Sequence, residues 1–273
     1  MKIILPGLLL FIFGFIPSDK CEAQQWPATD AATEASGRLD AISLGLVSSI
    51  HNQAGLADVK NMSFALNAES RFSGLGLNNV SFIGVLPSKS GVFGIDIQQF
   101  GYNLYTESKL GLAYSRYLAK TLSMGIQLNY LRRAITEYGV HSDFSAEAGL
   151  LFHPSKDWMA GIHLYNISFS KNPLSGETYP VRFSAGIRYA SSSSLNLLAG
   201  LEKEVSMPAS FRTGVEYHVT EKISLRTGLI SAPFEWSFGL GYAVGQWQID
   251  AASSYHQWLG ISPMLTLSYV RNK

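Results

Sequence analysis

Alternation between two kinds of side chain is strictest in the stretch Val181-Arg182-Phe183-Ser184-Ala185-Gly186-Ile187-Arg188-Tyr189. Its apolar residues occupy every second position, and the positions between them carry Ser, Gly and two arginines. The same period recurs at 123–130, 211–218 and 223–229. A period of two is typical of a β-strand with two unlike faces. A soluble β-sandwich alternates in the same way, so the pattern indicates strands and leaves the architecture open.

The composition narrows that choice. Only 15% of the 273 residues are charged, whereas 12% are aromatic and 25 are glycine. Soluble domains carry about 25% charged residues, and the mean hydropathy of +0.10 is too low for a bundle of membrane helices. The 21 basic and 20 acidic residues are scattered, which argues against a nucleic-acid partner. A charge-poor chain rich in aromatic residues and glycine favours a β-barrel in lipid.

The N-terminus has the form of a secretory signal peptide. Lys2 precedes an apolar stretch from Ile3 to Ile16, which is too short to span a bilayer, and small residues follow it. We expect cleavage after Ala23, so that residues 1–23 are removed and the protein is integral to the outer membrane of a Gram-negative cell. A lipoprotein anchored at Cys21 is the alternative. Because Cys21 is the one cysteine, the mature chain has none.

Fourteen strands account for the chain from residue 61 to residue 273. We expect them at 61–71, 79–86, 92–99, 109–117, 123–132, 144–152, 158–166, 181–189, 195–203, 210–218, 223–230, 236–243, 247–255 and 264–270. Connections after even-numbered strands are short, and those after odd-numbered strands are mostly longer: 100–108, 133–143, 167–180 and 256–263. Such sorting is typical of outer-membrane barrels. The sequence therefore predicts an all-β fold, a transmembrane antiparallel up-and-down β-barrel.

Aromatic residues near both ends of these strands support the same interpretation, because their rings suit the headgroup level. Aromatic residues that fill an ordinary strand core are the alternative. In a barrel, the polar side chains of each strand face the lumen. The charged residues expected there are Glu147, Arg182, Arg188, Glu202, Arg212, Glu216, Arg226 and Asp250. Because the signs alternate across neighbouring strands, we expect ion pairs that hold the lumen together; contact with a substrate is the alternative.

Residues 24–60 do not follow the strand pattern. They begin with a polar, Ala-rich stretch and continue with small and apolar residues at 41–50. A barrel of about 14 strands lies between filled eight-stranded barrels and open porins, so its lumen has room for a folded segment. We expect residues 24–60 to form an N-terminal plug. A periplasmic tail or an ordinary loop remains the alternative.

One motif in this segment resembles a known family. The hexapeptide Asn52-Gln53-Ala54-Gly55-Leu56-Ala57 is similar to the Asn-Pro-Ala-Gly-Leu-Ala element of the FadL superfamily of fatty-acid transporters. That superfamily includes the PorV/PorQ-type barrels associated with type IX secretion. The resemblance implies a fourteen-stranded outer-membrane barrel with a plug. Gln53 stands where the family has proline, and the chain is shorter than typical members.

The sequence carries no motif for enzymatic chemistry. The six histidines are dispersed, and one cysteine excludes both a disulfide framework and a thiolate metal site, so we expect no cofactor. Ser253, Ser254 and His256 are the candidates for a surface hydrolase, but no acid partner accompanies them, and nucleophile and base must lie within hydrogen-bond reach.

We therefore expect a non-enzymatic protein. The first interpretation is a PorV/PorQ-like accessory or scaffold in secretion or surface assembly, with secretion-system proteins as partners. The alternative is a FadL-like diffusion channel for a hydrophobic small molecule, and a hydrolase is a remote third. In all three, outer-membrane lipid surrounds the barrel.

Overall fold

The computed structural model describes residues 29–168, 180–205 and 207–271. The predicted signal peptide 1–23, with Cys21, and residues 24–28 lie outside this part of the chain, so the cleavage after Ala23 stays a prediction. Among the described residues, no helix is long and apolar enough to cross a membrane.

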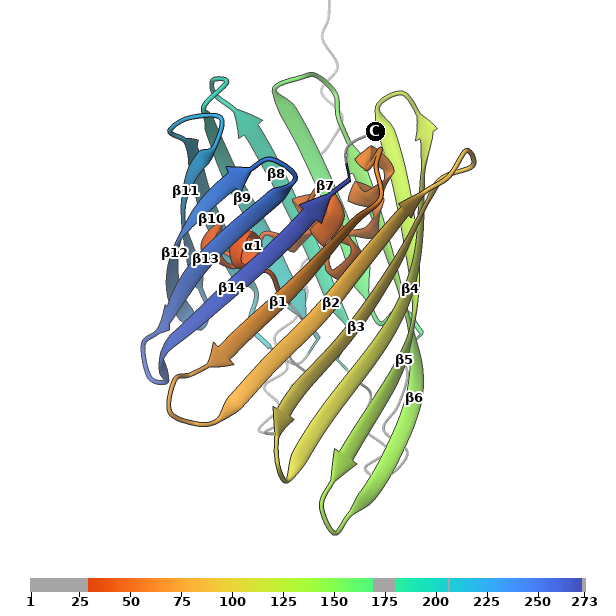
Figure 1. Ribbon diagram of the computed structural model, residues 1–273, viewed down its shortest axis with the longest axis vertical. Coiled ribbons are helices and arrows are strands. Elements are labelled where there is room, and N and C mark those ends of the chain that lie inside the picture. The colour runs from red at the N-terminus through yellow and green to blue at the C-terminus, as the bar shows by residue number, and fades with distance from the viewer. Residues whose placement is uncertain (1–28, 169–179, 206, 272–273) are drawn as a thin grey trace, which may run out of the picture.

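Fourteen antiparallel strands close into one barrel (Figure 1). Each strand pairs with its neighbours in the chain, and β1 pairs with β14, for example Leu66 with Leu267. The strands are β1 (Ser63–Arg71), β2 (Leu77–Pro87), β3 (Val92–Tyr102), β4 (Tyr105–Ala119), β5 (Leu122–Ile135), β6 (Gly139–Phe152), β7 (Trp158–Tyr165), β8 (Arg182–Ala190), β9 (Leu195–Glu204), β10 (Ser210–His218), β11 (Ile223–Ser231), β12 (Phe234–Val244), β13 (Trp247–His256) and β14 (Gly260–Val270). The predicted barrel is confirmed, and every predicted strand overlaps an observed one.

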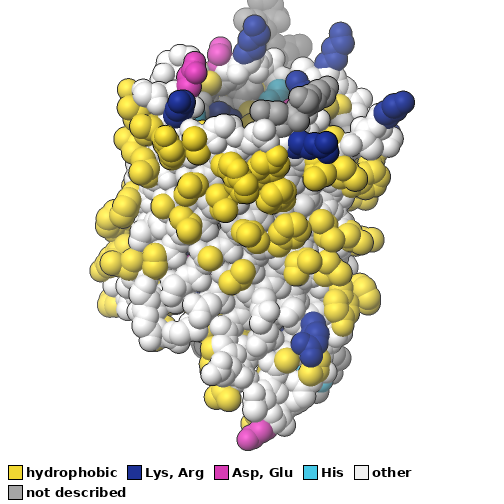
Figure 2. All heavy atoms as spheres, viewed as in Figure 1, with side chains coloured by type: hydrophobic (Ala, Val, Ile, Leu, Met, Phe, Trp, Pro, Cys, Tyr) yellow, Lys and Arg dark blue, Asp and Glu magenta, His cyan; other side chains and the backbone are white. Residues whose placement is uncertain are grey.

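The alternation seen in the sequence becomes an outer and an inner face. On β4, Leu112 is 59% exposed while its neighbour Ala113 is 4% exposed. Apolar side chains cover the middle of the outer face over β1 to β5 (Figure 2). Lipid cannot hydrogen-bond the backbone, and a closed ring leaves no unpaired strand edge. The apolar outer face and the fully paired backbone of the closed ring thus both suit a surrounding of lipid.

The predicted difference in loop length between the two ends is wrong for three of the four longer connections. β3 and β4 are joined across Asn103 and Leu104, and β13 and β14 across residues 257–259. β5 and β6 are joined across residues 136–138, where Glu137 has a φ of +70°. Polar residues continue the strands beyond the apolar band, and tight turns with a positive φ close the hairpins. Most of the fourth connection, 167–180, lies outside the described residues.

The two ends of the barrel are distinguished by the chain ends. We call the end where β1 begins and β14 finishes the terminal rim, and the opposite end, with the turns after odd-numbered strands, the hairpin rim. In Figure 1 the terminal rim is at the top, and β4 to β6 reach furthest toward the bottom. The longest connection, between β7 and β8, belongs to the hairpin rim, and in outer-membrane barrels the longer loops are extracellular.

Residues 29–60, here called the inner segment, lie inside the ring of strands (Figure 1). The segment consists of α1 (Ala31–Ala35) and three short 3₁₀ helices, η1 (Asp40–Ile42), η2 (Leu46–Ile50) and η3 (Gln53–Asp58). α1 packs against β11 to β14, η1 against β7 and β8, η2 against β1 to β3, and η3 against β3 to β6. The segment therefore contacts the barrel wall on opposite sides, as a body that fills the lumen must.

Candidate functional site

The inner wall carries a belt of glycines on consecutive strands. Its members are Gly94, Gly111, Gly125, Gly149, Gly161, Gly186, Gly200, Gly214, Gly228 and Gly239, one from each strand from β3 to β12. A β-carbon at most of them would overlap the inner segment; at Gly161 it would meet the carbonyl oxygen of Ala41, and at Gly125 the backbone of Gln53. Glycine in a strand often marks such a close backbone approach. The belt lets the inner segment lie directly on the wall.

The glycine belt separates two layers of the lumen between β3 and β7. Toward the terminal rim the inward side chains are mostly apolar: Val92, Ala113, Leu151 and Met159. Toward the hairpin rim they are polar or charged: Asp96, Lys109, Gln127, Glu147 and His163. This belt was not expected from the sequence, although its glycines occupy the same alternate positions as the inward polar residues.

The hexapeptide 52–57 is the anchor of the inner segment. Asn52 donates from Nδ2 to the carbonyl oxygens of Ala41 (2.6 Å), Leu150 (3.2 Å) and Ile162 (3.1 Å), and its Oδ1 accepts from the amide of Ala54 at 3.1 Å. Asn52 therefore joins η1, η3 and two strands of the wall. A side chain at this position with both donor and acceptor is required for that set of bonds.

The rest of the hexapeptide packs into the same junction. Gln53 stands where the similar element of the FadL superfamily has proline. Its Nε2 donates to Glu147 Oε2 at 2.9 Å, a contact that proline could not make. A β-carbon at Gly55 would overlap Ser43 and Ser48 of the inner segment. Ala54 and Leu56 are fully buried, and Ala57 is half-buried.

Glu147 is the centre of a buried polar network on the wall. Its carboxylate accepts hydrogen bonds from Asn129 Nδ2 at 2.7 Å and Gln53 Nε2 at 2.9 Å. His163 Nε2 lies 3.1 Å from Oε2, and Lys109 Nζ lies 3.7 Å from Oε1 and 3.2 Å from Asp96 Oδ1. A buried carboxylate is tolerated only when it is paired and hydrogen-bonded. The network meets that condition and joins β4, β5, β6 and β7 to the inner segment.

His51 holds the inner segment together from within. Its Nε2 lies 2.9 Å from Asp30 Oδ2 and its Nδ1 lies 3.4 Å from Asp40 Oδ1. Burial opposes a charge on His51, but Asp40 and Asp30 outweigh it and raise the pKa of the imidazole. Burial likewise opposes a charge on Asp30, but the hydrogen bond to His51 lowers the pKa of that carboxyl. The pair is therefore most stable as an ion pair.

A small polar cavity lies between the inner segment and the wall. It is lined by Asp40, His51, Lys109, Glu147, His163 and Arg182 among others, and its volume is about 20 Å³. That is room for water, whereas pockets for small organic ligands measure about 300–1,000 Å³. In this conformation the cavity is too small and too polar for a hydrophobic ligand.

The other charged residues expected in the lumen lie on the inner face. Arg212 pairs with Glu202, which Arg182 approaches at 4.0 Å. Arg226 Nη1 lies 2.6 Å from Asp250 Oδ1, and Arg226 Nε lies 3.7 Å from Glu216 Oε1. Glu216 also accepts from Ser36 of the inner segment at 3.1 Å. These contacts place neighbouring strands and the inner segment in one network of opposite charges.

Arg188 is the exception in this set. It is half-buried on the inner face of β8, in register with Leu198, and makes no ion pair within the described chain. Its position near the terminal rim, beyond the glycine belt, separates it from the carboxylates toward the hairpin rim.

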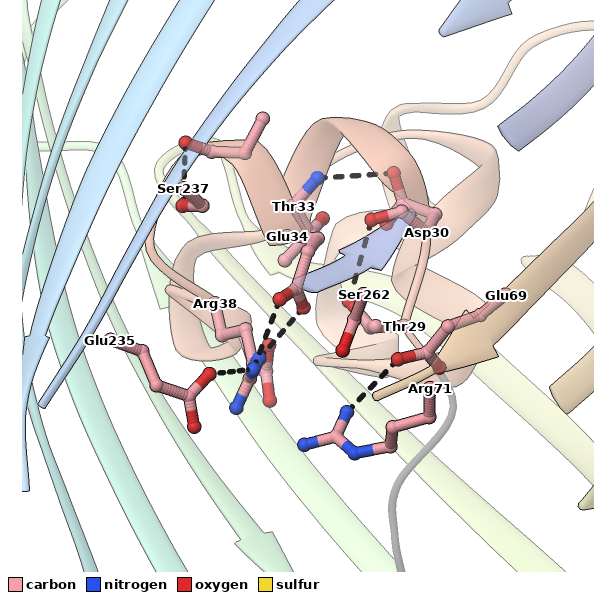
Figure 3. Close-up of polar contacts among 12 residues, drawn as sticks. Thr29, Asp30, Thr33, Glu34, Arg38, Glu69, Arg71, Glu235, Ser237 and Ser262 are labelled. Atoms are coloured by element: carbon pink, nitrogen blue, oxygen red, sulfur yellow. Dashed lines mark hydrogen bonds and ion pairs between the residues drawn. The ribbon is translucent and has the colours of Figure 1, made fainter. Parts of the chain in front are cut away.

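A second charged cluster, near the hairpin rim, was not expected from the sequence (Figure 3). Arg38 of the inner segment binds Glu34 at 2.7 Å and also binds Glu235 of β12, and Arg71 lies 3.0 Å from Glu69 on β1. Burial opposes a charge on Glu34, but Arg38 lowers the pKa of that carboxyl to about 2. Arg38 thus fastens the first turn of the inner segment to the wall.

The candidate hydrolase residues do not form a catalytic arrangement. Ser253 and Ser254 point to opposite faces of β13 because they are neighbours in one strand. His256 Nδ1 accepts from the amides of Trp258 and Leu259, each at 3.2 Å, so the ring stabilises the hairpin turn. Within the described residues, no group of three or more His, Cys, Asp or Glu could hold a metal ion.

Comparison with known proteins finds similarity in the fold alone. No family model and no curated protein matches the sequence. Among solved structures, the toluene transporter TbuX of Ralstonia pickettii is 12% identical with a TM-score of 0.68, covering 90% of this chain and 99% of its own. The monoaromatic hydrocarbon channel CymD is 10% identical with a TM-score of 0.70, covering 92% and 100%. A FadL homologue of Pseudomonas aeruginosa is 12% identical with a TM-score of 0.63, covering 90% and 99%.

This chain has the fold of FadL-like outer-membrane transporters. The similar structures are named as transporters and channels, which agrees with the expectation of a non-enzymatic protein. Their likeness to this chain, at 10–12% identity, is one of fold, so the channel alternative and the scaffold interpretation both stay proposals. The PorV/PorQ-type group has no support from them, and type IX secretion remains a prediction.

Proposed function

We propose that this protein is an outer-membrane channel for hydrophobic small molecules, which the inner segment closes. The observation that carries the proposal is the apolar layer of the inner wall. Ile83, Val85, Val92 and Ala113 face inward from β2, β3 and β4, and the side chains that cover them include Ile50 and Leu56 of the inner segment. A second such cluster joins Leu39 and Ile42 to the wall. A channel for water-soluble solutes has a polar, water-filled interior.

Movement of the inner segment would therefore uncover an apolar surface inside the barrel. A hydrophobic molecule gains about 25 cal/mol for each Å² of apolar surface that it removes from water. The inner wall would provide such a surface only while η1, η2 and η3 are displaced. The small cavity supports this view, because it leaves no room for a ligand while the segment is in place.

A disulfide that locks the inner segment tests the proposal. Ser49 of η2 is suitable, because its Oγ lies 2.8 Å from the position of a β-carbon at Gly94 on β3. The β-carbons of a disulfide lie about 3.5–4.5 Å apart. If residues 1–23 are removed, the double variant Ser49→Cys with Gly94→Cys contains no competing thiol. We expect cells that carry the oxidised double variant to take up radiolabelled toluene no faster than cells that lack the protein. Uptake should return when the disulfide is reduced.

The reduced double variant is the main control, because it carries both substitutions without the cross-link. The single variant Ser49→Cys is the second control, because it cannot lock the segment and leaves Gly94 of the belt in place. Equal uptake by the oxidised and reduced double variants would contradict the proposal.

Mass spectrometry of the purified chain tests the localisation: a mature N-terminus at Gln24 and recovery with outer membranes are expected.

A PorV/PorQ-like scaffold in secretion or surface assembly is the second candidate. The ion-paired, filled lumen favours it, because a scaffold needs a stable barrel and no passage. This function requires partner proteins. Purification of the full chain from its own membranes should then recover secretion components in fixed proportion, whereas a barrel recovered alone, with toluene uptake that depends on the inner segment, favours the channel.

A further inference from the structure

Exposed basic side chains line one arc of the terminal rim. They are Lys60, Lys89, Arg116, Lys120 and Arg271, and they lie on or beside β14, β1, β2, β3, β4 and β5, which are neighbours in the barrel. Figure 2 shows Lys and Arg side chains along the upper edge of this face, above the apolar band. Within the described chain none of the five forms an ion pair. We call this set the basic arc.

Acidic residues do not balance the basic arc. Among the residues of the arc that the structure describes, Asp58 is the exposed acidic one, and the hydroxyl of Tyr117 on β4 donates a hydrogen bond to it. The five cations therefore face the surroundings with little compensation. The hairpin rim differs, because the exposed Arg132 and Glu137 there carry opposite charges.

Clustered aromatic rings lie directly below the basic arc on the outer face. Phe64 of β1 stacks on Tyr269 of β14 with ring centroids 5.0 Å apart, and Trp247 of β13 lies 4.8 Å from Tyr269. Phe93 and Tyr114 form a further pair, 5.1 Å apart, on β3 and β4. Tyr and Trp rings favour the level of the lipid headgroups. These rings place the basic arc just outside the apolar core of the bilayer.

The basic arc and the aromatic rings adjoin one another where β1 begins and β14 ends. Met62 and Phe64 lie two positions apart at the start of β1 and share its outward side, and the exposed Lys60 precedes Met62 by two positions. The amide of Arg271 donates to the carbonyl of Met62 at 3.0 Å, which places the two chain ends side by side. A lipid whose acyl chains lie on Phe64 and Tyr269 would thus have its headgroup beside Lys60 and Arg271.

We propose that the basic arc binds the phosphate headgroups of anionic glycerophospholipids in the leaflet at the terminal rim. Two properties support an anionic lipid as the ligand: uncompensated positive charge at headgroup level, and an aromatic surface beneath it for the acyl chains. Basic residues near a membrane surface attract anionic lipids. The longest connection, between β7 and β8, belongs to the hairpin rim. Because the longer loops of outer-membrane barrels are extracellular, the terminal rim faces the periplasm, where phospholipids form the leaflet.

Native mass spectrometry of the purified full chain tests this inference. The protein is exchanged into detergent with equal amounts of phosphatidylglycerol and phosphatidylcholine, and the retained lipids are counted. We expect phosphatidylglycerol to be enriched by about fivefold or more, since about 1 kcal/mol for one basic residue corresponds to that factor. The variant with Lys60→Gln, Lys89→Gln, Arg116→Gln, Lys120→Gln and Arg271→Gln should lose the enrichment, which should also weaken in high salt.

A control variant at the same rim tests whether the enrichment depends on the basic arc itself. Lys156→Gln with Lys222→Gln removes exposed charges from turns of the same rim outside the arc, and it should keep the enrichment. Equal retention of the two lipids by the unaltered protein would overturn the proposal, as would equal loss in both variants. Lipopolysaccharide is added in a third arm: if it displaces phosphatidylglycerol from the arc at equal concentration, the assignment to glycerophospholipid is wrong. Folding of each variant is checked by heat-modifiable mobility in gels, and a variant that fails is replaced by the single changes Lys60→Gln and Arg271→Gln.

Discussion

The imidazole of His51 lies 2.9 Å, from Nε2 to Oδ2, from the carboxylate of Asp30, the residue that begins α1. The other oxygen of Asp30 accepts from the amides of Ala32 at 3.0 Å and Thr33 at 3.1 Å and so caps the helix. On the far side of the ring, Nδ1 faces Asp40. Ionised carboxylates only accept hydrogen bonds, so a carboxylate on each side of the ring favours the charged imidazolium, with a proton on both nitrogens.

This arrangement makes the order of the inner segment depend on pH. The pKa of His51 is raised above its ordinary 6.5, so the stabilisation is complete below pH 6.5 and is lost as the pH rises through the folded-state pKa. The pKa of Asp30 is lowered from 3.8, so its contribution is lost only as the pH falls below that value. Hydrogen exchange of residues 38–58, corrected for its intrinsic pH dependence, should be slowest between these limits.

The variant His51→Gln is the control for that prediction. Glutamine has no proton to lose in this range, so the alkaline part of the pH dependence should disappear. Protection that is unchanged between pH 6 and pH 9 in the unaltered protein would contradict the role of His51. Lys109, Glu147 and His163 line the same cavity.

Replacement of a belt glycine should displace the inner segment. The β-carbon of Gly161→Ala would overlap the carbonyl oxygen of Ala41 and lie 2.7 Å from Leu151 Cδ2, so backbone must move. Overpacking of this kind costs about 1–3 kcal/mol. Unfolding in micelles should report the loss in stability, and exchange should increase at 38–58. Gly84→Ala, which adds a methyl group on the outer face beside Ile95, should have a much smaller effect.

Loss of the charge on Glu147 should destabilise the barrel. Glu147→Gln keeps the size of the side chain but leaves Lys109 and His163 facing a neutral amide. Hydrogen bonds to charged groups contribute about 1.5–3 kcal/mol, so we expect a loss of about 2 kcal/mol in the free energy of unfolding. Glu221→Gln, in an exposed turn, should change it by less than about 0.5 kcal/mol. Equal effects of the two changes would show that the network does not stabilise the fold.

Reversal of one ion pair in the lumen should show whether Arg212 stabilises the barrel through its pairing with Glu202. Arg212→Glu places a second carboxylate beside Glu202, and we expect a loss of about 3–5 kcal/mol in the free energy of unfolding, as when a buried pair is broken. Adding Glu202→Arg restores opposite signs and should recover part of this loss, because Arg182 then faces a like charge. A double variant no more stable than the single one would argue that Arg212 acts through its other contact, the carbonyl of Arg38.

The local pattern of the sequence determined the strands and their faces. Because side chains alternate with a period of two along any strand, the inward position of Glu147, Arg182 or Asp250 follows from sequence parity once one face is assigned. The hexapeptide at Asn52 likewise marked the segment that was expected to form a plug, although its contacts, such as that of Gln53 with Glu147, needed the structure. The strand ends at the hairpin rim were misjudged, because polar residues there resemble loop residues.

The partners of each charge were decided by the tertiary structure alone. Arg38 binds Glu235, which lies 197 positions away in the sequence. The need for glycine in the belt is explained only by the inner segment, which lies against most of these positions. Such contacts depend on the closure of the ring and on the path of the inner segment through it. A period of two is a property of neighbouring residues, whereas filling a lumen depends on distant segments that meet only after the barrel has closed.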